Sequence, residues 1–276
     1  MNYIKLATIT ALSSTILLSG LSASAQETRE VETDGTIEFI SDTDQELIVT
    51  PPEPGEPGEP GQPGPDEIVI NPEVPGTTGP LSIIKAVTMD FGSQVISNQD
   101  QTYNMIAEMV ELAEARPDGT TEVPYVSFAQ VSDTRGSNAG WDLQVSLSDF
   151  TSNTQNNVLN GAQVALNDAR IQYAGNNQNN APTTQSGSIE LIPESGSVSI
   201  MKADSGKGAG VSSVVWGNQA DLSSQFEDES VDTVENSAIQ VSIPGATAKD
   251  ATTYTSNLSW ELVTLPGEDG ETVPEV

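Results

Sequence analysis

The chain has 276 residues, of which 40 are acidic and 9 are basic, so its formal net charge is −31. Because affinity for nucleic acid and for anionic membranes comes mainly from Lys and Arg, this balance argues against both as partners. Cysteine and histidine are absent, which excludes disulfides, thiol chemistry, the usual zinc sites and any catalytic triad that needs His.

Residues 1–25 have the pattern of a secretory signal peptide. Lys5 is their only charged residue, an apolar stretch follows at 9–21, and Ala23-Ser24-Ala25 matches the small-x-small pattern that signal peptidase cuts after. The apolar stretch is short and interrupted by Ser and Thr, which favours cleavage over a membrane-spanning helix. No later segment is suited to span a bilayer and no Leu-Pro-x-Thr-Gly sorting signal is present. We therefore expect a secreted, extracellular protein without a membrane span.

Residues 26–79 are predicted to form a disordered acidic stalk. Arg29 is their only basic residue, and the short apolar pieces at 37–40 and 47–49 supply too little apolar area to offset the entropy of ordering. From Pro54 to Pro65, Gly recurs at every third position, as in collagen, but so few triplets do not make a stable triple helix. An extended polyproline-like spacer is the simpler interpretation.

From residue 80 to residue 266, short strands alternate with Gly-, Asn-, Ser- and Pro-rich turns. This pattern predicts an all-β domain, an antiparallel and Greek-key-like β-sandwich, followed by an acidic tail at 267–276. Residues 103–115 are rich in Met, Ala, Glu and Leu and favour helix by propensity. From the surrounding strands we interpret 103–108 as a strand and leave 109–115 unassigned. The predicted strands are 81–88, 103–108, 125–131, 141–147, 189–192, 198–202, 211–216, 238–243 and 254–263.

Two of the predicted strands carry a Trp-x-Leu sequence. Trp141 and Leu143 fall on one face of the first strand, and Trp260 and Leu262 fall on one face of the second, because side chains in a strand alternate with a period of two. Both pairs lie on the apolar face of their strand. They therefore either pack in a core, or contact a ligand, or do both, and the sequence leaves these alternatives open.

Several sequence blocks around these pairs carry a family resemblance. Two Trp-x-Leu pairs, in this order and within this frame of blocks, resemble the WxL-domain cell-surface proteins of Gram-positive bacteria. The resemblance covers residues 80–266, while residues 105–122 and the acidic tail depart from the family pattern. The blocks are Leu81-Ser82-Ile83, Asp90-Phe91-Gly92, 100–103, 128–143, Leu159-Asn160-Gly161-Ala162, 243–248 and 254–262.

The resemblance implies a protein that is held non-covalently on the cell wall by its C-terminal domain, with peptidoglycan as the receptor. It also implies assembly with other WxL-domain or WxL-interacting surface proteins. From the residues themselves we expect no enzyme. One alternative is an adhesin that binds host matrix ligands and uses the WxL domain as its anchor. A carbohydrate-active enzyme, which needs two suitably spaced acids, is the less favoured alternative. Among so many acids such a pair arises by chance, and no acid stands in a motif that suggests a catalytic cleft.

The candidate contacts with peptidoglycan follow from side-chain chemistry. An indole face stacks on the C–H face of a sugar. The guanidinium of Arg135, in the segment Asp133-Thr134-Arg135-Gly136, is suited to form bidentate hydrogen bonds with a carboxylate of a wall peptide. The alternative for this segment is a turn in which Asp133 accepts backbone N–H bonds and the arginine pairs with a neighbouring acid. The candidate ligand-binding residues are Trp141, Leu143, Trp260, Leu262 and Arg135.

The negative charge bears on metal binding and on attachment. The acidic cluster at 227–232 suits calcium by its oxygens but lacks the EF-hand spacing, so we interpret it as solvated loop and expect neither metal nor cofactor. Gram-positive walls carry anionic teichoic polymers, so the long-range interaction with this chain is repulsive over roughly 8 Å at physiological salt. Binding is therefore expected to be short-range and determined by shape.

Overall fold

The computed structural model describes residues 36–40, 48–52, 68–70 and 76–265. Contacts divide the chain into two units, Met1–Glu38 and Phe39–Val276, and the fold described below belongs to the second unit. The predicted signal peptide, the Pro-Gly triplets and the acidic tail at 267–276 lie outside the described residues. Residues 37–40, one of the short apolar pieces of the predicted stalk, are exposed and belong to no strand.

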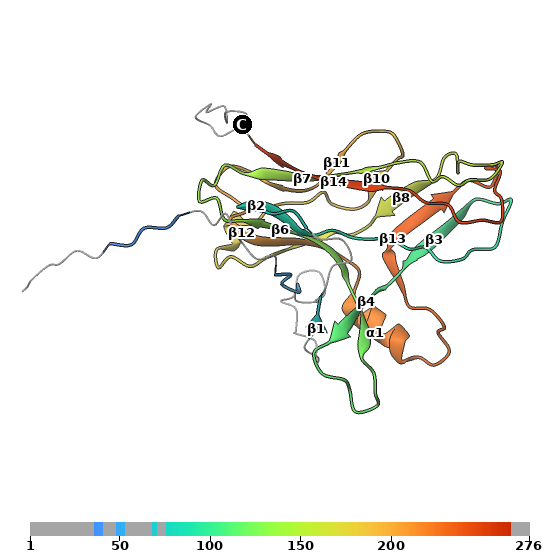
Figure 1. The fold of residues 1–276 in the computed structure, drawn as a ribbon, viewed down its shortest axis with the longest axis horizontal. Coiled ribbons are helices and arrows are strands. Elements are labelled where there is room, and N and C mark those ends of the chain that lie inside the picture. Colours follow the sequence, from blue (N-terminus) through green and yellow to red (C-terminus); the bar gives the residue numbers. More distant parts are fainter. Residues whose placement is uncertain (1–35, 41–47, 53–67, 71–75, 266–276) are drawn as a thin grey trace, which may run out of the picture. The chain divides into compact units, whose positions relative to one another are not determined.

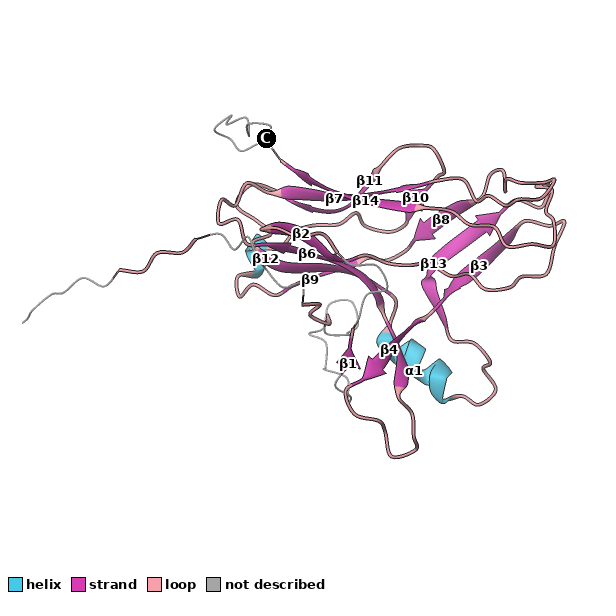
Figure 2. Cartoon of the chain, viewed as in Figure 1, coloured by secondary structure: helices cyan, strands magenta, loops and turns pink. Residues whose placement is uncertain are grey.

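The second unit is an all-β, antiparallel sandwich, as predicted (Figures 1 and 2). Most neighbouring strands are distant in sequence, with the orders β10-β8-β13-β3, β11-β7-β14, β2-β6-β12-β9 and β1-β4-β5. The elements are β1 (Ile68–Val69), β2 (Leu81–Lys85), β3 (Gln101–Ile106), β4 (Glu108–Leu112), β5 (Glu122–Tyr125), β6 (Ser127–Asp133), β7 (Trp141–Leu147), β8 (Gln163–Leu166), β9 (Arg170–Tyr173), η1 (Gln178–Asn180), β10 (Ile189–Leu191), β11 (Val198–Ala203), β12 (Gly210–Trp216), α1 (Gln219–Glu227), β13 (Glu235–Ile243) and β14 (Leu258–Thr264).

The main core lies between the sheets. Figure 1 shows β7, β11 and β14 in one layer and β2, β6 and β12 in the layer that faces it. Strand β7 alternates buried and half-buried residues along its whole length, as expected of a strand with one face on a core. Its buried residues Leu143 and Val145 belong to the same cluster as Val131 of β6 and Val214 of β12. Burial of this face fixes the register of β7 in its sheet.

Each predicted stretch contains a strand, but several elements escaped prediction. Unpredicted are strands β1, β8 and β9, most of β4 and β5, the short helix η1 and helix α1. The helix buries only Leu222, so its sequence has little helical periodicity. The available signal was its N-cap, where the Asn218 side chain accepts hydrogen bonds from the backbone N–H groups of Ala220 and Asp221.

Residues 103–115, whose composition favours helix, form the end of β3 and all of β4. Met105, Ala107 and Val110 bury their side chains against the two cores, at 1%, 5% and 9% exposure. Tertiary packing thus overrides the intrinsic helical preference of this segment. Strand β4 pairs with β5, and α1 packs beside this hairpin over a second, smaller core that includes Val123, Phe128 and Leu222.

Part of the predicted stalk belongs to the domain. Strand β1 pairs with β4, and Pro52 is buried where its carbonyl accepts a hydrogen bond from the Tyr125 hydroxyl. The Gln130 side chain pairs with the backbone of Thr50, accepting from its N–H at 3.0 Å and donating to its carbonyl at 2.6 Å. We expected residues 26–79 to make no contact with a core, and this is wrong for residues 49–52 and 68–70. The edge of β4 and the side-chain amide of Gln130 supply hydrogen bonds to these residues. The expectation considered only apolar area and therefore omitted them.

Candidate functional site

The two Trp-x-Leu pairs lie side by side on one sheet. Strands β7 and β14 are antiparallel neighbours, with Leu143 opposite Leu262 and Val145 opposite Trp260. Directly opposite residues in a sheet point to the same face. Both pairs therefore point toward the main core, and the structure brings together two motifs that are far apart in the sequence.

The two pairs differ in exposure. Trp141 and Leu143 are 0% exposed, and Trp141 Nε1 donates to the carbonyl of Gly208 at 3.2 Å. Trp260 and Leu262 are half-buried, because β14 lies at the edge of its sheet. With no exposed surface, Trp141 and Leu143 pack in the core, which was one of the alternatives that the sequence left open. Trp260 and Leu262 pack on the core and keep accessible surface.

Arg135 is engaged within its own loop. Its Nε and one terminal nitrogen donate to the carboxylate of Asp133 at 2.9 and 2.8 Å, and that same nitrogen donates to the Gly140 carbonyl at 3.0 Å. Asp133 also accepts the backbone N–H of Arg135 at 3.1 Å. The side chains of the pair are only 16% and 2% exposed. The structure thus supports the turn over the carboxylate grip, and the ion pair holds the loop that precedes Trp141.

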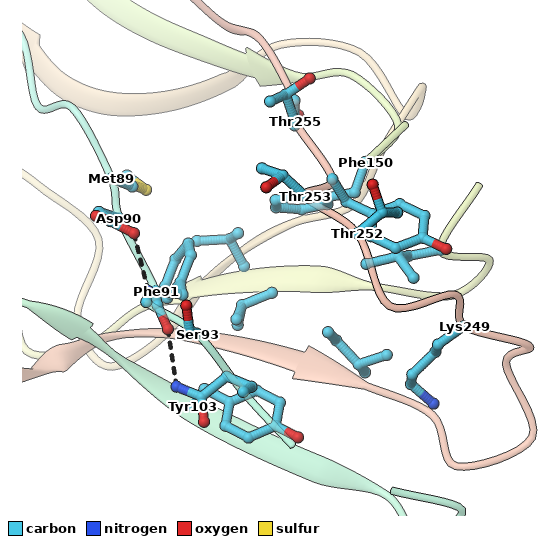
Figure 3. Close-up of a pocket in the computed structure, with 18 of the residues that line it drawn as sticks. Met89, Asp90, Phe91, Ser93, Tyr103, Phe150, Lys249, Thr252, Thr253 and Thr255 are labelled. Atoms are coloured by element: carbon cyan, nitrogen blue, oxygen red, sulfur yellow. Dashed lines mark hydrogen bonds between the residues drawn. The ribbon is translucent and has the colours of Figure 1, made fainter. Parts of the chain in front are cut away.

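A groove opens at the opposite end of β7 and β14, where Leu147 and Leu258 are paired. Counted along β7, it lies about 20 Å from Trp141. Its volume is about 880 Å³, which falls in the range of small-ligand sites. We call it the end groove, and Figure 3 shows side chains that line it. Its walls come from β3, β13 and β14 and from the loops at 89–96 and 249–256, and its aromatic residues are Phe91, Tyr103, Phe150 and Tyr254.

Lys249 anchors one wall of the end groove. Its Nζ donates to the backbone carbonyls of Ser97, Pro244 and Thr247 at 3.2, 3.1 and 3.0 Å. An ammonium group has three N–H donors, so all of them are used within the protein. Lys249 therefore fixes the loops around the groove and is not free to bind an anion.

Asp250 fastens the same wall to a neighbouring loop. Its carboxylate accepts the backbone N–H of Asn156 at 2.8 Å and the side-chain amide of Asn156 at 2.7 Å, and the Tyr254 hydroxyl donates to the Asn156 carbonyl at 2.6 Å. The backbone hydrogen bond from Asn156, followed by those from side chains, lowers the pKa of Asp250 below its usual 3.8. A carboxyl with a lowered pKa stabilises the fold at pH values above its unfolded pKa, and this contribution is lost as the pH falls through the folded pKa.

The turn after β13 makes tight contacts with two neighbouring loops. A Cβ on Gly245 would lie 2.4 Å from the carbonyl oxygen of Asn98, and a Cβ on Gly161 would lie 3.0 Å from Pro244 Cγ. The Gly245 N–H donates to Asp100 Oδ1 at 2.8 Å. The blocks at 90–92, 159–162 and 243–248 thus meet at one end of the sandwich. In the sequence analysis these blocks supported only the family resemblance, because a sequence pattern does not show that they lie close together in the fold.

The comparisons with known proteins agree with this organisation. A family model described as "WxL domain surface cell wall-binding" matches residues 26–266. The match confirms the resemblance at 80–266 and extends it through 26–79. Searches of curated proteins and of solved structures found no significant match. Within the described part of the chain, no helix has the length and apolar character needed to cross a membrane.

Proposed function

Because the chain belongs to the WxL domain surface cell wall-binding family, we propose that it is secreted and held non-covalently on a Gram-positive cell wall by binding peptidoglycan. The observation that carries the proposal is the end groove, which combines aromatic rings with exposed hydroxyls on a rigid β-scaffold. Assembly with other WxL-domain or WxL-interacting surface proteins belongs to the same proposal, on the strength of the family resemblance. The role proposed is that of a binding module and not of an enzyme.

The end groove suits a polymer built from sugar rings and amides. Phe91, Tyr103 and Tyr254 are half-buried, so the fold holds these rings in place and leaves part of their surface accessible. Aromatic rings combine apolar area with defined geometry, and tyrosine adds a polar tip. Trp260 and Leu262 follow Leu258 on the same face of β14. They stay candidate contacts outside the groove, farther along β14.

Co-sedimentation with purified peptidoglycan that has been stripped of teichoic acids tests the proposal. The secreted protein is expected in the pellet, and a protein of similar charge from outside the family controls for trapping. Protein that remains in the supernatant would mean that attachment needs a partner protein, and the proposal of a self-sufficient wall-binding domain would be wrong.

On intact walls, retention is expected to rise severalfold with added salt, with divalent cations and with acidification toward pH 4. The charge of −31 is repelled by anionic wall polymers, and salt shortens the screening length from about 8 Å at 0.15 M to about 3 Å at 1 M. Protonation of carboxylates near pH 4 lowers the same repulsion.

The same series on peptidoglycan stripped of teichoic acids serves as the control, where a flatter response is expected. Retention on intact walls that stays constant or falls across the series would contradict the idea that repulsion opposes attachment.

A further inference from the structure

The end groove offers no free positive charge to a ligand. Its ionisable lining residues, among those described, are Asp90, Lys249 and Asp250, together with tyrosine. Lys249 donates to three carbonyls, as described above, and Asp90 accepts the backbone N–H of Gly92 at 2.8 Å. Recognition of a carboxylate or phosphate relies on Arg, Lys or clustered N–H donors. Among the described lining residues, the groove therefore has no side-chain cation left to bind the acidic ends of wall peptides or the phosphates of teichoic polymers.

Neutral polar groups face the groove instead. Figure 3 shows Thr252 and Thr253 on one wall and Phe91 and Ser93 on the other. Thr252, Thr253 and Ser93 are exposed. A hydroxyl both donates and accepts hydrogen bonds, so it pairs equally well with sugar hydroxyls and with acetamido groups.

Apolar surface lies directly beside these hydroxyls. Phe91, Tyr103 and Phe150 are half-buried in the groove walls, and Val95 and Ile96 on its rim are 89% and 53% exposed. A pyranose ring has the matching character, with an apolar C–H face and a rim of polar groups. Exposed apolar residues next to a groove mark a binding surface more often than isolated ones do.

From this arrangement we infer that the end groove binds an uncharged, acetamido-bearing glycan segment. The inference rests on the proposed function and names the part of peptidoglycan that is recognised, which is the glycan strand and not the stem peptide. Sugar rings pack against Phe91 and Tyr103, and the hydroxyls of Thr252 and Thr253 bond to the polar rim of the sugar. A stem peptide, a teichoic polymer and a second copy of this chain are the competing occupants.

The probe is the N-acetylglucosamine tetramer, a neutral glycan without peptide, titrated into the full secreted protein in solution. Saturable binding is expected, and the tetramer is expected to displace the protein from stripped peptidoglycan, whereas free stem peptide and purified teichoic acid are not. A Thr252→Val/Thr253→Val double variant removes two exposed hydroxyls at similar side-chain volume. It is expected to bind the tetramer about tenfold more weakly, with an unchanged thermal melt.

The matched control is Thr121→Val, which changes an exposed threonine in the loop between β4 and β5 and is expected to bind as the wild type does. Displacement by stem peptide or teichoic acid but not by the tetramer would overturn the glycan assignment and leave peptidoglycan binding intact. Equal affinity of the wild type and the double variant would place the glycan outside the groove. Self-association that competes with the tetramer would assign the groove to a second copy.

Titration in solution does not depend on pelleting, so the two proposals fail separately. Tetramer binding without co-sedimentation would contradict the proposed function and support the inference. Co-sedimentation without any tetramer binding would support the proposed function and contradict the inference that the groove binds a glycan.

Discussion

Trp141→Ala is expected to lower the free energy of unfolding by about 3–5 kcal/mol, as other large-to-small changes of a core aromatic do. Trp141 is fully buried at the start of β7, and its indole N–H bonds to Gly208. The change leaves a cavity between the sheets and removes the partner of that carbonyl. Urea denaturation of the variant and the wild type measures the difference.

Trp216→Ala is the matched control, because Trp216 is equally buried and lies outside both Trp-x-Leu pairs. Its indole nitrogen has no hydrogen-bond partner among the described residues, so its replacement loses packing alone. Both variants are expected to lose wall retention only in proportion to the fraction unfolded. A Trp141→Ala protein that is fully folded and no longer binds would show that Trp141 is a contact residue and not a core residue.

Gly208→Ala is expected to lower the free energy of unfolding by about 2–5 kcal/mol. Gly208 has φ +76°, a left-handed conformation that disfavours a side chain, and an added Cβ would lie 2.4 Å from Ala203 Cβ and 2.7 Å from Trp141 Nε1. Strain and overpacking therefore act together at the base of the first Trp-x-Leu pair. Thermal or urea unfolding measures the loss.

Gly206→Ala separates these two causes. Gly206 has a similar φ of +83°, but no atom lies within 4 Å of its added Cβ, so this variant is expected to show the strain alone, about 1 kcal/mol. Equal losses in the two variants would mean that crowding of the added Cβ against Ala203 and Trp141 costs no stability, which would contradict the expectation of overpacking.

The sequence predicted the core more accurately than it predicted the site, and strand periodicity explains the difference. The alternation in 141–147 identified β7 with its bounds and the face that it buries. Periodicity states which residues share a face, but it does not state whether a neighbour covers that face. Trp141 and Trp260 therefore looked equivalent in the sequence, and only the edge position of β14 distinguishes them.

The end groove was beyond prediction because its walls come from segments that are distant in the chain. Phe91, Tyr103 and Tyr254 each stand in a separate block, and the antiparallel pairing of β3 with β13 and of β7 with β14 brings these blocks together. The contacts of residues 49–52 with the domain escaped prediction for a related reason. The bonds between Thr50 and Gln130 join residues 80 positions apart, and neither residue is apolar.

The most direct test of the account is to map which end of the sandwich touches the wall. A photoreactive benzophenone side chain in place of Val95, which is 89% exposed on the rim of the end groove, is compared with the same group in place of Ser137, an exposed residue in the loop before Trp141. After binding to stripped peptidoglycan and irradiation, the account predicts glycan fragments covalently attached at position 95 and none at position 137. Attachment at position 137 with none at position 95 would contradict it, and would return the contact surface to the end that carries Arg135 and Trp141.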